Sequence, residues 1–430
     1  MNRTLLTWCS LVLVALGAER AAAAPPNVLM IIGDDQAWTD FGFMGHGVIQ
    51  TPNLDRLASQ SLVFTRGYVP SSLCRPSLAS MVTGLYAHQH RITSNDPPGG
   101  LPREEVLRQR GLQIANIEQV PTLPRMLGQQ GYSSLQTGKW WEGHYSRGGF
   151  THGMTHGDPA RGGRHGDEGL KIGREGMEPI FDFIEEAGPR PFFVWYAPFL
   201  PHSPHNPPER LLAKYRDRTE SIHVARYWAM CEWFDETCGE LLDFLDRKKL
   251  AENTLVLFVT DNGWIQDPDT PRYAPKSKRS PYDGGIRTPI MVRWPGRIAA
   301  KRDDVTLAIS VDLAPTALAA CGLEPTDAME GVNLMDGEAV ARRNRIFGEI
   351  FAHNAVDVGK PASSLEYRWC IEDWWKLIVP NPANVPGPGA ELYNLQSDPH
   401  ETKDLAAENP DKAKHLRARI EDWWPAEAQP

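Results

Sequence analysis

The stretch Asn27-Val-Leu-Met-Ile-Ile-Gly-Asp-Asp35 decides the fold class, because an unbroken apolar run leads directly into two carboxylates. A run without alternating polar residues is typical of a strand that is buried on both faces, as in a parallel sheet. A second run of the same kind, Thr254-Leu-Val-Leu-Phe-Val259, leads into Thr260-Asp-Asn-Gly263. Two such strands with helical segments between them predict an α/β fold.

The segments around these two strands alternate between helical and extended patterns. Residues 221–250 carry their apolar side chains along one stripe, which is typical of an amphipathic helix. Residues 143–169, rich in Gly and His, are expected to form a loop. We predict a large, mostly parallel sheet flanked by helices over residues 25–340. Its further strands are expected at 132–136, 191–196 and 290–294, and its further helices at 52–62, 122–130, 174–187 and 311–320.

The chain changes character after residue 340. Short strand candidates at 345–350, 365–371 and 375–379 precede a Pro-rich stretch and a final helix near 408–424. Neighbouring short strands followed by a helix are typical of α+β architecture. We therefore expect residues 341–430 to form a small α+β subdomain, with an antiparallel sheet and a helix.

Residues 1–24 have the pattern of a secretory signal peptide. The basic start Met1-Asn-Arg3 is followed by apolar residues from Leu5 to Ala18 and by Ala21-Ala-Ala-Ala24, where cleavage is expected. About 14 apolar residues are too few to span a bilayer. No later stretch is long and apolar enough, so we expect no membrane anchor. The mature protein is expected to be exported, to the periplasm or to the medium.

The composition excludes several classes of protein. The chain has 430 residues, with 45 Lys and Arg against 54 Asp and Glu, so its formal net charge is −9. The fractions of 41% hydrophobic and 23% charged residues are those of a soluble globular protein. An acidic chain argues against a dedicated nucleic-acid binder, but a local pocket on it can still be cationic. Without Cys9 the cysteines are odd in number, so at least one is expected to be unpaired.

The chemistry is expected where strands end. Asp34 and Asp35 follow one buried strand, and Asp261 and Asn262 follow another. In open α/β sheets, sites form at the carboxyl ends of strands. Carboxylate and amide oxygens suit Ca²⁺ or Mg²⁺. Alone, each pair is more often a turn or a helix cap, but two acidic ends on long buried strands together favour a metal site.

A further candidate is Cys74, in Ser72-Leu-Cys-Arg-Pro-Ser77. Pro76 suits a first helical turn, so Cys74 is expected at a helix N-terminus, where an anion is favoured and a thiol would be activated. The alternative is an ordinary small buried cysteine. Lys139, Lys278 and His202 are candidate cationic donors. A metal, cations and a reactive side chain at one place describe a site that transfers an anionic tetrahedral group.

These residues resemble the formylglycine-dependent sulfatases of the alkaline phosphatase superfamily. The resemblance covers nearly the whole mature chain, and the order and spacing of the motifs are specific. It implies an alkaline phosphatase-like fold and a sulfuric ester hydrolase of the arylsulfatase type. The motifs are Pro26-Asn-Val-Leu-Met-Ile-Ile-Gly-Asp-Asp35, Thr51-Pro-Asn-Leu-Asp-Arg-Leu-Ala58, Cys74-Arg-Pro-Ser-Leu-Ala-Ser-Met-Val-Thr-Gly84, Thr137-Gly-Lys-Trp140, Pro201-His-Ser-Pro204, Thr260-Asp-Asn-Gly263, Lys278 with Tyr282-Asp-Gly-Gly-Ile-Arg-Thr-Pro289, and Leu392-Tyr-Asn-Leu395.

The resemblance also implies the roles of single residues. Cys74 would be oxidised by a formylglycine-generating maturation enzyme, and the hydrate of the resulting aldehyde would attack the sulfur. After this attack the sulfate would be bound to the hydrate as an ester. The aldehyde then re-forms as the C–O bond to that sulfate breaks, so one difficult hydrolysis becomes two easier steps. Lys139 and Lys278 would hold the sulfate oxygens, and His202 would lie beside the leaving alcohol. One Ca²⁺, or Mg²⁺, would be held by Asp34, Asp35, Cys74, Asp261 and Asn262.

Two residues depart from the family pattern. The family motif is Cys-x-Pro-x-Arg, and Leu78 stands at the Arg position. That Arg normally helps the maturation enzyme to recognise the motif. The family also reads Gly-Lys-Trp-His, and Trp141 stands at the His position. His144 is the first candidate to replace this histidine, and His152, His156 and His165 are the others.

Three functions remain open from the sequence. The favoured one is an exported sulfatase that acts on a sulfated carbohydrate or an aryl sulfate. The carbohydrate is inferred from the predicted export and from the substrates that are usual in the family. The second is a phosphoester or phosphonate hydrolase of the same superfamily. The third is a catalytically inactive, metal-stabilised homologue, which the changes at Leu78 and Trp141 favour. Relative activity on aryl sulfate and aryl phosphate separates the first two.

Overall fold

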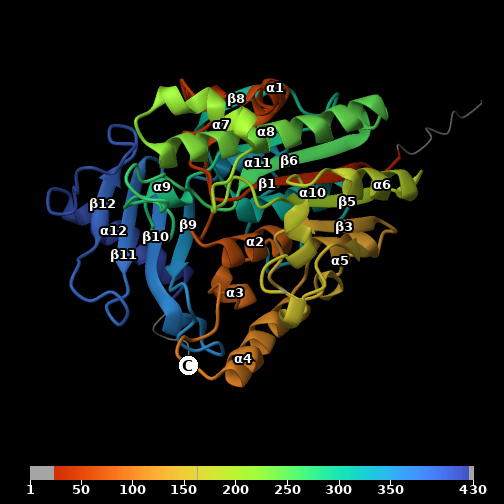
Figure 1. Ribbon diagram of the computed structural model, residues 1–430. Coiled ribbons are helices and arrows are strands. Elements are labelled where there is room, and N and C mark those ends of the chain that lie inside the picture. The colour runs from red at the N-terminus through yellow and green to blue at the C-terminus, as the bar shows by residue number, and fades with distance from the viewer. Residues whose placement is uncertain (1–23, 162, 426–430) are drawn as a thin grey trace, which may run out of the picture.

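The computed structural model describes residues 24–161 and 163–425, and within them the main feature is an eight-stranded sheet. The strands lie in the order β4-β3-β5-β1-β6-β7-β2-β8 (Figure 1). β7 is antiparallel to both of its neighbours, and the remaining pairs are parallel. The strands are β1 (Asn27–Gly33), β2 (Leu62–Tyr68), β3 (Ser133–Gly138), β4 (His152–Gly153), β5 (Phe192–Ala197), β6 (Thr254–Thr260), β7 (Ile290–Arg293) and β8 (Lys301–Ile309).

Helices cover both faces of this sheet, which is why its central strands are apolar throughout. Along β1, Val28 and Met30 pack into one apolar cluster and Leu29 and Ile31 into another. The first cluster contains residues of α2, α5 and α10, and the second contains residues of α1, α6 and α8. The helices are α1 (Pro52–Ser59), α2 (Cys74–Thr83), α3 (Ala87–His90), α4 (Arg103–Ala115), α5 (Leu123–Gly128), α6 (Glu178–Ala187), α7 (Glu209–Tyr215), α8 (Ile222–Arg247), α9 (Asp283–Ile286), α10 (Leu313–Ala320) and α11 (Gly337–Arg342).

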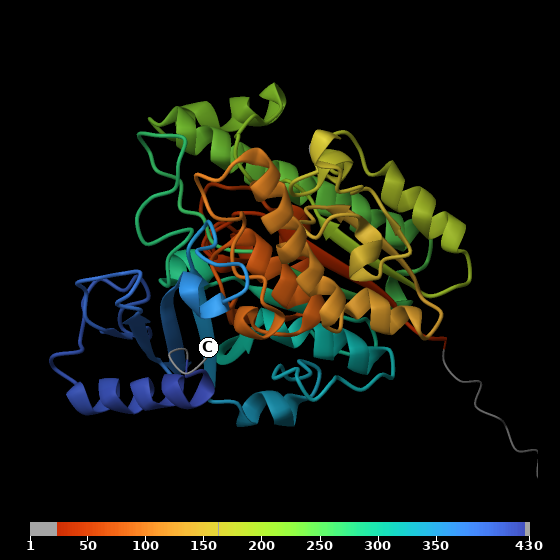
Figure 2. The same cartoon turned by 90° about the horizontal axis from the view of Figure 1, so that it is seen from below.

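A second, four-stranded sheet follows in the chain and lies beside the first (Figure 1). Its order is β12-β11-β10-β9, with β9 (Arg345–Phe351), β10 (Leu365–Glu372), β11 (Trp375–Pro380) and β12 (Glu391–Asn394), and all its pairs are antiparallel. Figure 2 shows α12 (Pro410–Trp423) along the outside of this sheet. Trp369 of β10 is fully buried and belongs to the same apolar cluster as Val28, so the two sheets share one core.

The predicted fold class is confirmed: a mostly parallel sheet between helices, followed by a small antiparallel sheet. Several elements were not expected from the sequence, namely β2, β8, β12, α3, α4, α7, α9 and α11. The segment 143–169, expected to be a loop, contributes the short edge strand β4. The boundary between residues 340 and 341 stays a prediction.

Other expectations concern the termini and the cysteines. Residues 1–23 of the predicted signal peptide lie outside the described residues. No helix among the described residues is long and apolar enough to cross a membrane. Five cysteines are described and each is free, including Cys231 and Cys238, which share α8.

Candidate functional site

The predicted metal ligands lie together because their strands are neighbours. β1 and β6 pair in parallel with Gly33 opposite Thr260, so the residues that follow them emerge side by side. The backbone N–H of Asp35 donates to Asp261 Oδ1 at 3.0 Å, and Asn262 Nδ2 donates to Asp35 Oδ1 at 2.7 Å. All four side chains are buried. Asp35 has φ of +65°, an uncommon backbone for a non-glycine residue, of the kind that occurs at functional sites.

Cys74 begins α2, as predicted, and its thiol faces this cluster. The Sγ atom lies 4.0 Å from Asp34 Oδ1 and 3.9 Å from Asp35 Oδ1. Asp34, Asp35, Cys74 and His202 each place a ligand atom within 4.8 Å of the others. Burial, followed by the charge of Asp261, raises the pKa of the Cys74 thiol. The expected activation by the helix N-terminus is therefore outweighed, and the unmodified thiol is a poor nucleophile.

Two buried lysines face the carboxylates. Lys139, directly after β3, donates to Asp34 Oδ1 at 2.9 Å, and Lys278 donates to Asp35 at 2.6 Å and to Cys74 Sγ at 3.3 Å. Burial alone would lower the pKa of each lysine, but the adjacent carboxylates raise it, so both stay cationic. For Asp35, burial alone would raise the pKa, yet Lys278 and then His202 hold it below its ordinary value.

His202 approaches the cluster from the segment after β5. Its Nε2 lies 3.3 Å from Asp35 Oδ2, while Nδ1 donates to the carbonyl oxygen of Ser203 at 2.5 Å. Burial lowers the pKa of His202 well below its ordinary value, although Asp35 opposes this. The imidazole is thus held in one orientation with Nε2 toward Asp35.

The donor set fits a hard divalent cation. Asp34 Oδ2, Asp261 Oδ2 and Asn262 Oδ1 are buried and have no hydrogen-bond partner among the described residues. Buried oxygens without a partner cost free energy, so three of them at one place need a ligand. Oxygen donors of this kind match Ca²⁺ and Mg²⁺ better than a soft metal.

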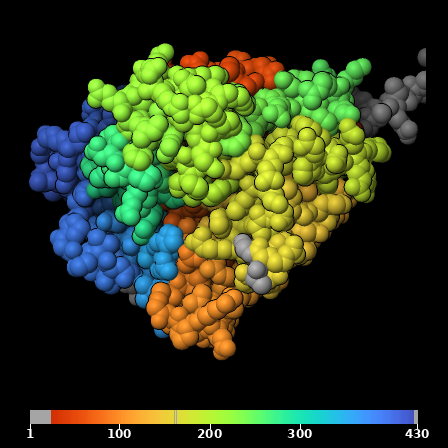
Figure 3. Space-filling model, in the orientation of Figure 1, coloured from red at the N-terminus to blue at the C-terminus, as the bar shows by residue number. Residues whose placement is uncertain are grey.

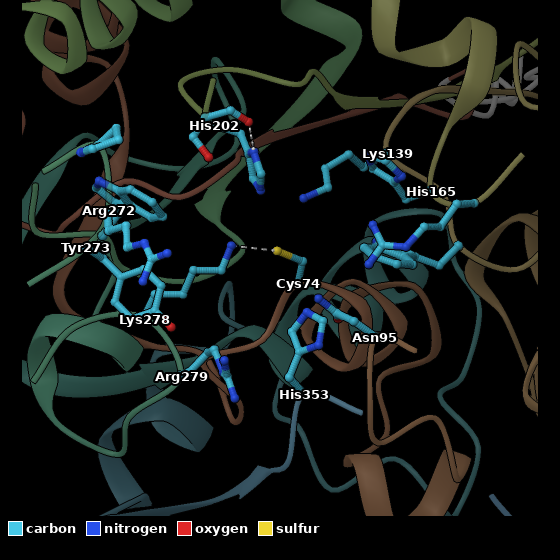
Figure 4. Close-up of a pocket in the computed structure, with 15 residues that line it drawn as sticks. Cys74, Asn95, Lys139, His165, His202, Arg272, Tyr273, Lys278, Arg279 and His353 are labelled. Carbon is cyan, nitrogen blue, oxygen red and sulfur yellow. Dashed lines mark hydrogen bonds between the residues drawn. The ribbon is translucent and has the colours of Figure 1, made fainter. Parts of the chain in front are cut away.

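Cys74, Lys139, His202 and Lys278 form the floor of a pocket of about 620 Å³, and the carboxylates lie beneath this floor. Figure 4 shows Lys139, His202 and Lys278 pointing toward Cys74 from three sides. Figure 3 shows the surface hollowed where the green segment that carries residues 265–280 meets the yellow segment that carries residues 150–165. The space exceeds that of a sulfate group, so the wall of the pocket can contact the group that the sulfate esterifies.

The two departures from the family motifs are explained by packing. Leu78 is 4% exposed and lies in the apolar cluster under α2. Arg75 does not replace the missing cation, because it points to Glu142, with contacts of 2.8 and 2.6 Å, and to Gln113 at 2.9 Å. Trp141 is buried in the pocket wall, with the guanidinium of Arg164 4.6 Å from its ring centre.

The histidines of the predicted loop lie in different places. His144 is exposed, pairs with Ser146, and is not among the residues that line the pocket. His165 does line it, with its ring 5.1 Å from that of Trp141. Burial and the nearby Lys139 and Arg164 lower the pKa of His165 to about 3, so this imidazole is neutral. Of the four candidates, His165 is the one that the fold brings to the pocket.

Sequence reasoning missed much of the wall. Arg279 adjoins the predicted Lys278, and Trp264 follows the Asp-Asn-Gly turn, so a search of the residues next to each motif finds both. His353 follows β9 of the small sheet, and no local signal marks it. The missed residues that line the pocket are Asn95, Arg164, Ser203, Trp264, Pro271, Arg272, Tyr273, Arg279 and His353.

Known proteins resemble this chain along most of its length. The family model described as Sulfatase matches residues 26–323, and the model described as N-sulphoglucosamine sulphohydrolase, C-terminal, matches residues 274–423. Human N-acetylgalactosamine-6-sulfatase is 30% identical over 376 residues, which cover 74% of this chain and 67% of the relative. Arylsulfatase A of Bos taurus is 32% identical over 391 residues, which cover 75% of this chain and 69% of the relative.

A solved structure with a similar fold contains a bound substrate, D-glucosamine-2-N,6-O-disulfate. It aligns with a TM-score of 0.71 at 19% identity and covers 94% of this chain and 98% of that one. At this identity the likeness shows the fold. The family model, by contrast, spans more than half of the chain and includes every predicted ligand and lysine. The chain therefore belongs to the sulfatase family, a family of sulfuric ester hydrolases in the alkaline phosphatase superfamily.

Proposed function

We propose that this protein is an exported sulfatase that hydrolyses a sulfate ester of a carbohydrate, with formylglycine made from Cys74 as the nucleophile. One observation carries the proposal: a buried Cys74 faces three carboxylates, two lysines and a histidine at the floor of a pocket. The names of the relatives support the substrate class.

One divalent cation, Ca²⁺ or Mg²⁺, would be held by Asp34, Asp35, Asp261, Asn262 and the modified Cys74. When bound, it supplies positive charge to the oxygens of the sulfate group. Lys139 and Lys278 supply two further charges, because both are cationic and both point into the pocket. Such fixed charges stabilise the extra negative charge of the transition state.

His202 is proposed to act on the leaving oxygen. With Nδ1 engaged by Ser203, its Nε2 is the ring atom that faces the pocket floor. In the neutral ring Nδ1 carries the proton and Nε2 is an acceptor, so Nε2 must first take up a proton. The negative charge of a bound sulfate favours that uptake, and the proton can then pass to the alcohol as its bond to sulfur breaks. Burial raises the pKa of the Cys74 thiol, so the unmodified residue stays protonated and is a poor nucleophile. The formylglycine hydrate would supply a hydroxyl group as the nucleophile instead.

The nucleophile is tested by the mass of the peptide that contains Cys74, on protein purified from its own source. A mass lower by the difference between thiol and aldehyde is expected, and it would show that a formylglycine-generating enzyme accepts Leu78. An intact thiol would exclude the formylglycine mechanism and favour the phosphoesterase or the inactive homologue.

Activity is measured on an aryl sulfate, an aryl phosphate and sulfated sugars at equal metal concentration. We expect the sulfates to be preferred, Cys74→Ala to remove turnover, and Lys139→Ala to lower kcat by about 100-fold. A chelator is expected to lower both Tm and activity, and added Ca²⁺ to restore both. Preference for the phosphate would contradict the proposal.

Export is tested separately from catalysis. We expect the mature chain to begin near Pro25, after cleavage of residues 1–24, and to be found outside the cytoplasm. An N-terminal peptide of the purified protein that still contains Met1 would contradict this part.

A further inference from the structure

The pocket has more positive charge than the transfer of one sulfate needs. Above the floor, its wall carries Arg164, Arg272 and Arg279. No aspartate or glutamate is among the described residues that line it. The whole chain, by contrast, has a net charge of −9. A cationic pocket on an acidic protein concentrates positive potential where the substrate binds.

The three arginines of the wall differ in whether a carboxylate already neutralises their charge. Arg164 forms an ion pair with Asp96, which Arg110 shares. Among the described residues, the side chains of Arg272 and Arg279 have no hydrogen bond or ion pair. Arg279 lies within electrostatic range of Glu366 and His353. Burial raises the pKa of Glu366 and the charge of Arg279 opposes this, whereas burial lowers the pKa of His353 and Arg279 adds to that lowering. Arg272 and Arg279, called here the arginine pair, therefore have charge available for a ligand.

The backbone fixes the place of Arg279. Its φ is +65°, and Lys276, on the other side of Lys278, has φ of +57°. Left-handed backbone costs a non-glycine residue about 1 kcal/mol. The N–H of Arg279 donates to the carbonyl oxygen of Ser72 at 3.0 Å, which ties this loop to the segment that carries Cys74. The loop thus places Lys278 against the thiol and Arg279 at the pocket wall together.

His353 completes this side of the pocket from the small sheet. Its carbonyl oxygen accepts the N–H of Asn95 at 3.0 Å, so the segment after β9 is held against the segment after α3. Figure 4 shows Arg279 and His353 next to each other on one side of Cys74, with Arg272 farther out beyond Lys278. A substrate whose sulfate reaches Cys74 therefore occupies a pocket that the arginine pair lines.

We propose that the arginine pair binds a second anionic group of the substrate, so that the preferred substrate is a saccharide with a sulfate or carboxylate besides the sulfate that is removed. The inference rests on the proposed function. Guanidinium groups suit both anions, because their planar N–H groups match two oxygens at once. The second group needs no part in the reaction, so it raises affinity and selectivity more than kcat.

The test compares three disaccharides of equal size: one with a single sulfate, one with two sulfates, and one with a sulfate and a uronate carboxylate. We expect kcat/KM to be higher for at least one dianionic sugar than for the monosulfated one, mainly through KM. The selectivity is the ratio of these two kcat/KM values. Arg279→Gln is expected to lower it about tenfold, the loss of one charge-assisted hydrogen bond, and Arg272→Gln to lower it less.

Arg342→Gln is the matched control, because Arg342 is an exposed arginine of α11 outside the pocket. It is expected to leave the ratio unchanged. Arg279→Lys keeps the charge without the planar fork and is expected to fall between wild type and Arg279→Gln. The two dianionic sugars decide whether sulfate or carboxylate is the second group. An unchanged ratio in both Arg279→Gln and Arg272→Gln would overturn the proposal.

Binding without turnover separates this inference from the proposed function. Calorimetry with Cys74→Ala and with the same chain carrying Arg279→Gln measures affinity for the disulfated and the monosulfated sugar. If no sugar is turned over but Cys74→Ala prefers the dianion and loses that preference with Arg279→Gln, the inference stands and the proposed function fails. If turnover occurs but neither affinity nor selectivity responds to Arg279→Gln or to Arg272→Gln, the inference fails alone.

Discussion

At Arg75 the chain places a full positive charge in its interior. The guanidinium is 1% exposed, and Glu142 opposes it with two contacts. Two charges removed from water lose most of their hydration, and close pairing restores only part of that loss. The pair links the helix that begins with Cys74 to the segment after Lys139. The pair holds two parts of the site in place. Because Glu142 already neutralises Arg75, this arginine has no charge available for a ligand.

We expect Glu142→Gln to lower the free energy of unfolding by about 3 kcal/mol, because it leaves Arg75 buried without a counter-charge. Chemical denaturation measures this. Adding Arg75→Met to Glu142→Gln is expected to recover part of the loss. The control is Glu236→Gln, which breaks the exposed pair with Arg210 and is expected to cost less than about 1 kcal/mol. Equal losses in the two single variants would show that burial of the charge does not matter here.

At the scale of the element, the end of β3 depends on one glycine. Gly138 has φ of +73°, and a Cβ there would lie 1.8 Å from the carbonyl oxygen of Ala197. That same oxygen accepts the N–H of Lys139 at 2.7 Å. The close approach of β3 to β5 thus directs Lys139 toward Asp34.

Gly138→Ala is therefore expected to lower both stability, by about 3 kcal/mol or more, and activity, because backbone must move and Lys139 moves with it. Gly131→Ala is the matched control. Gly131 also has a left-handed backbone, φ +81°, but a Cβ there meets nothing within 4 Å. It is expected to cost about 1 kcal/mol, with activity kept. Similar effects at the two positions would refute the steric argument.

Two helices are joined by a cap from a distant residue. Asp235 of α8 accepts the backbone N–H groups of Asn53 and Leu54, in the first turn of α1, at 3.1 and 2.7 Å. These N–H groups have no partner inside their own helix. Thr51, the residue before α1, makes no such bond with its side chain. Burial raises the pKa of Asp235 from 3.8 to about 6.

This pKa predicts a pH dependence. The folded protein binds the proton of Asp235 more tightly than the unfolded chain, so stability due to this group falls as pH rises from about 4 to 6. The difference in unfolding free energy between wild type and Asp235→Asn should fall by about 2 kcal/mol between pH 4 and pH 7. Asp246→Asn, which changes an exposed carboxylate of the same helix, controls for net charge. A difference that does not change with pH would contradict the assignment.

The sequence predicted those strands and helices whose own residues show a clear hydrophobic pattern. β1 and β6 are buried along their whole length, so they appear as continuous apolar runs, and their ends located the acidic cluster. β8 begins with Lys301, Arg302 and two aspartates at the exposed edge of the sheet, so its pattern does not indicate a strand. His353 reaches the pocket only through the packing of the small sheet, which no local pattern records.

At the scale of the whole molecule, the two sheets are joined by buried charges as well as by apolar packing. Lys376 of β11 is fully buried and lies 2.9 Å from Asp283 Oδ1 and 2.7 Å from Glu401 Oε1. Asp283 begins α9, in the segment that follows Lys278, and its N–H donates to Glu401 at 2.6 Å. The loop that carries Lys278 and Arg279 is therefore connected, through α9, to the small sheet.

Lys376→Met should leave two buried carboxylates without a counter-charge and lower the free energy of unfolding by about 3–5 kcal/mol at pH 8. The loss should be smaller at pH 5. Burial raises the pKa of Glu401 from 4.5 to about 7 although Lys376 opposes this, so without the lysine the pKa rises further and the folded state takes up a proton. Denaturation of the whole chain at the two pH values measures both effects, and Glu401→Gln added to Lys376→Met should recover part of the stability at pH 8. A loss that is equal at both pH values, or no recovery in the double variant, would show that the two sheets are held together without this buried charge.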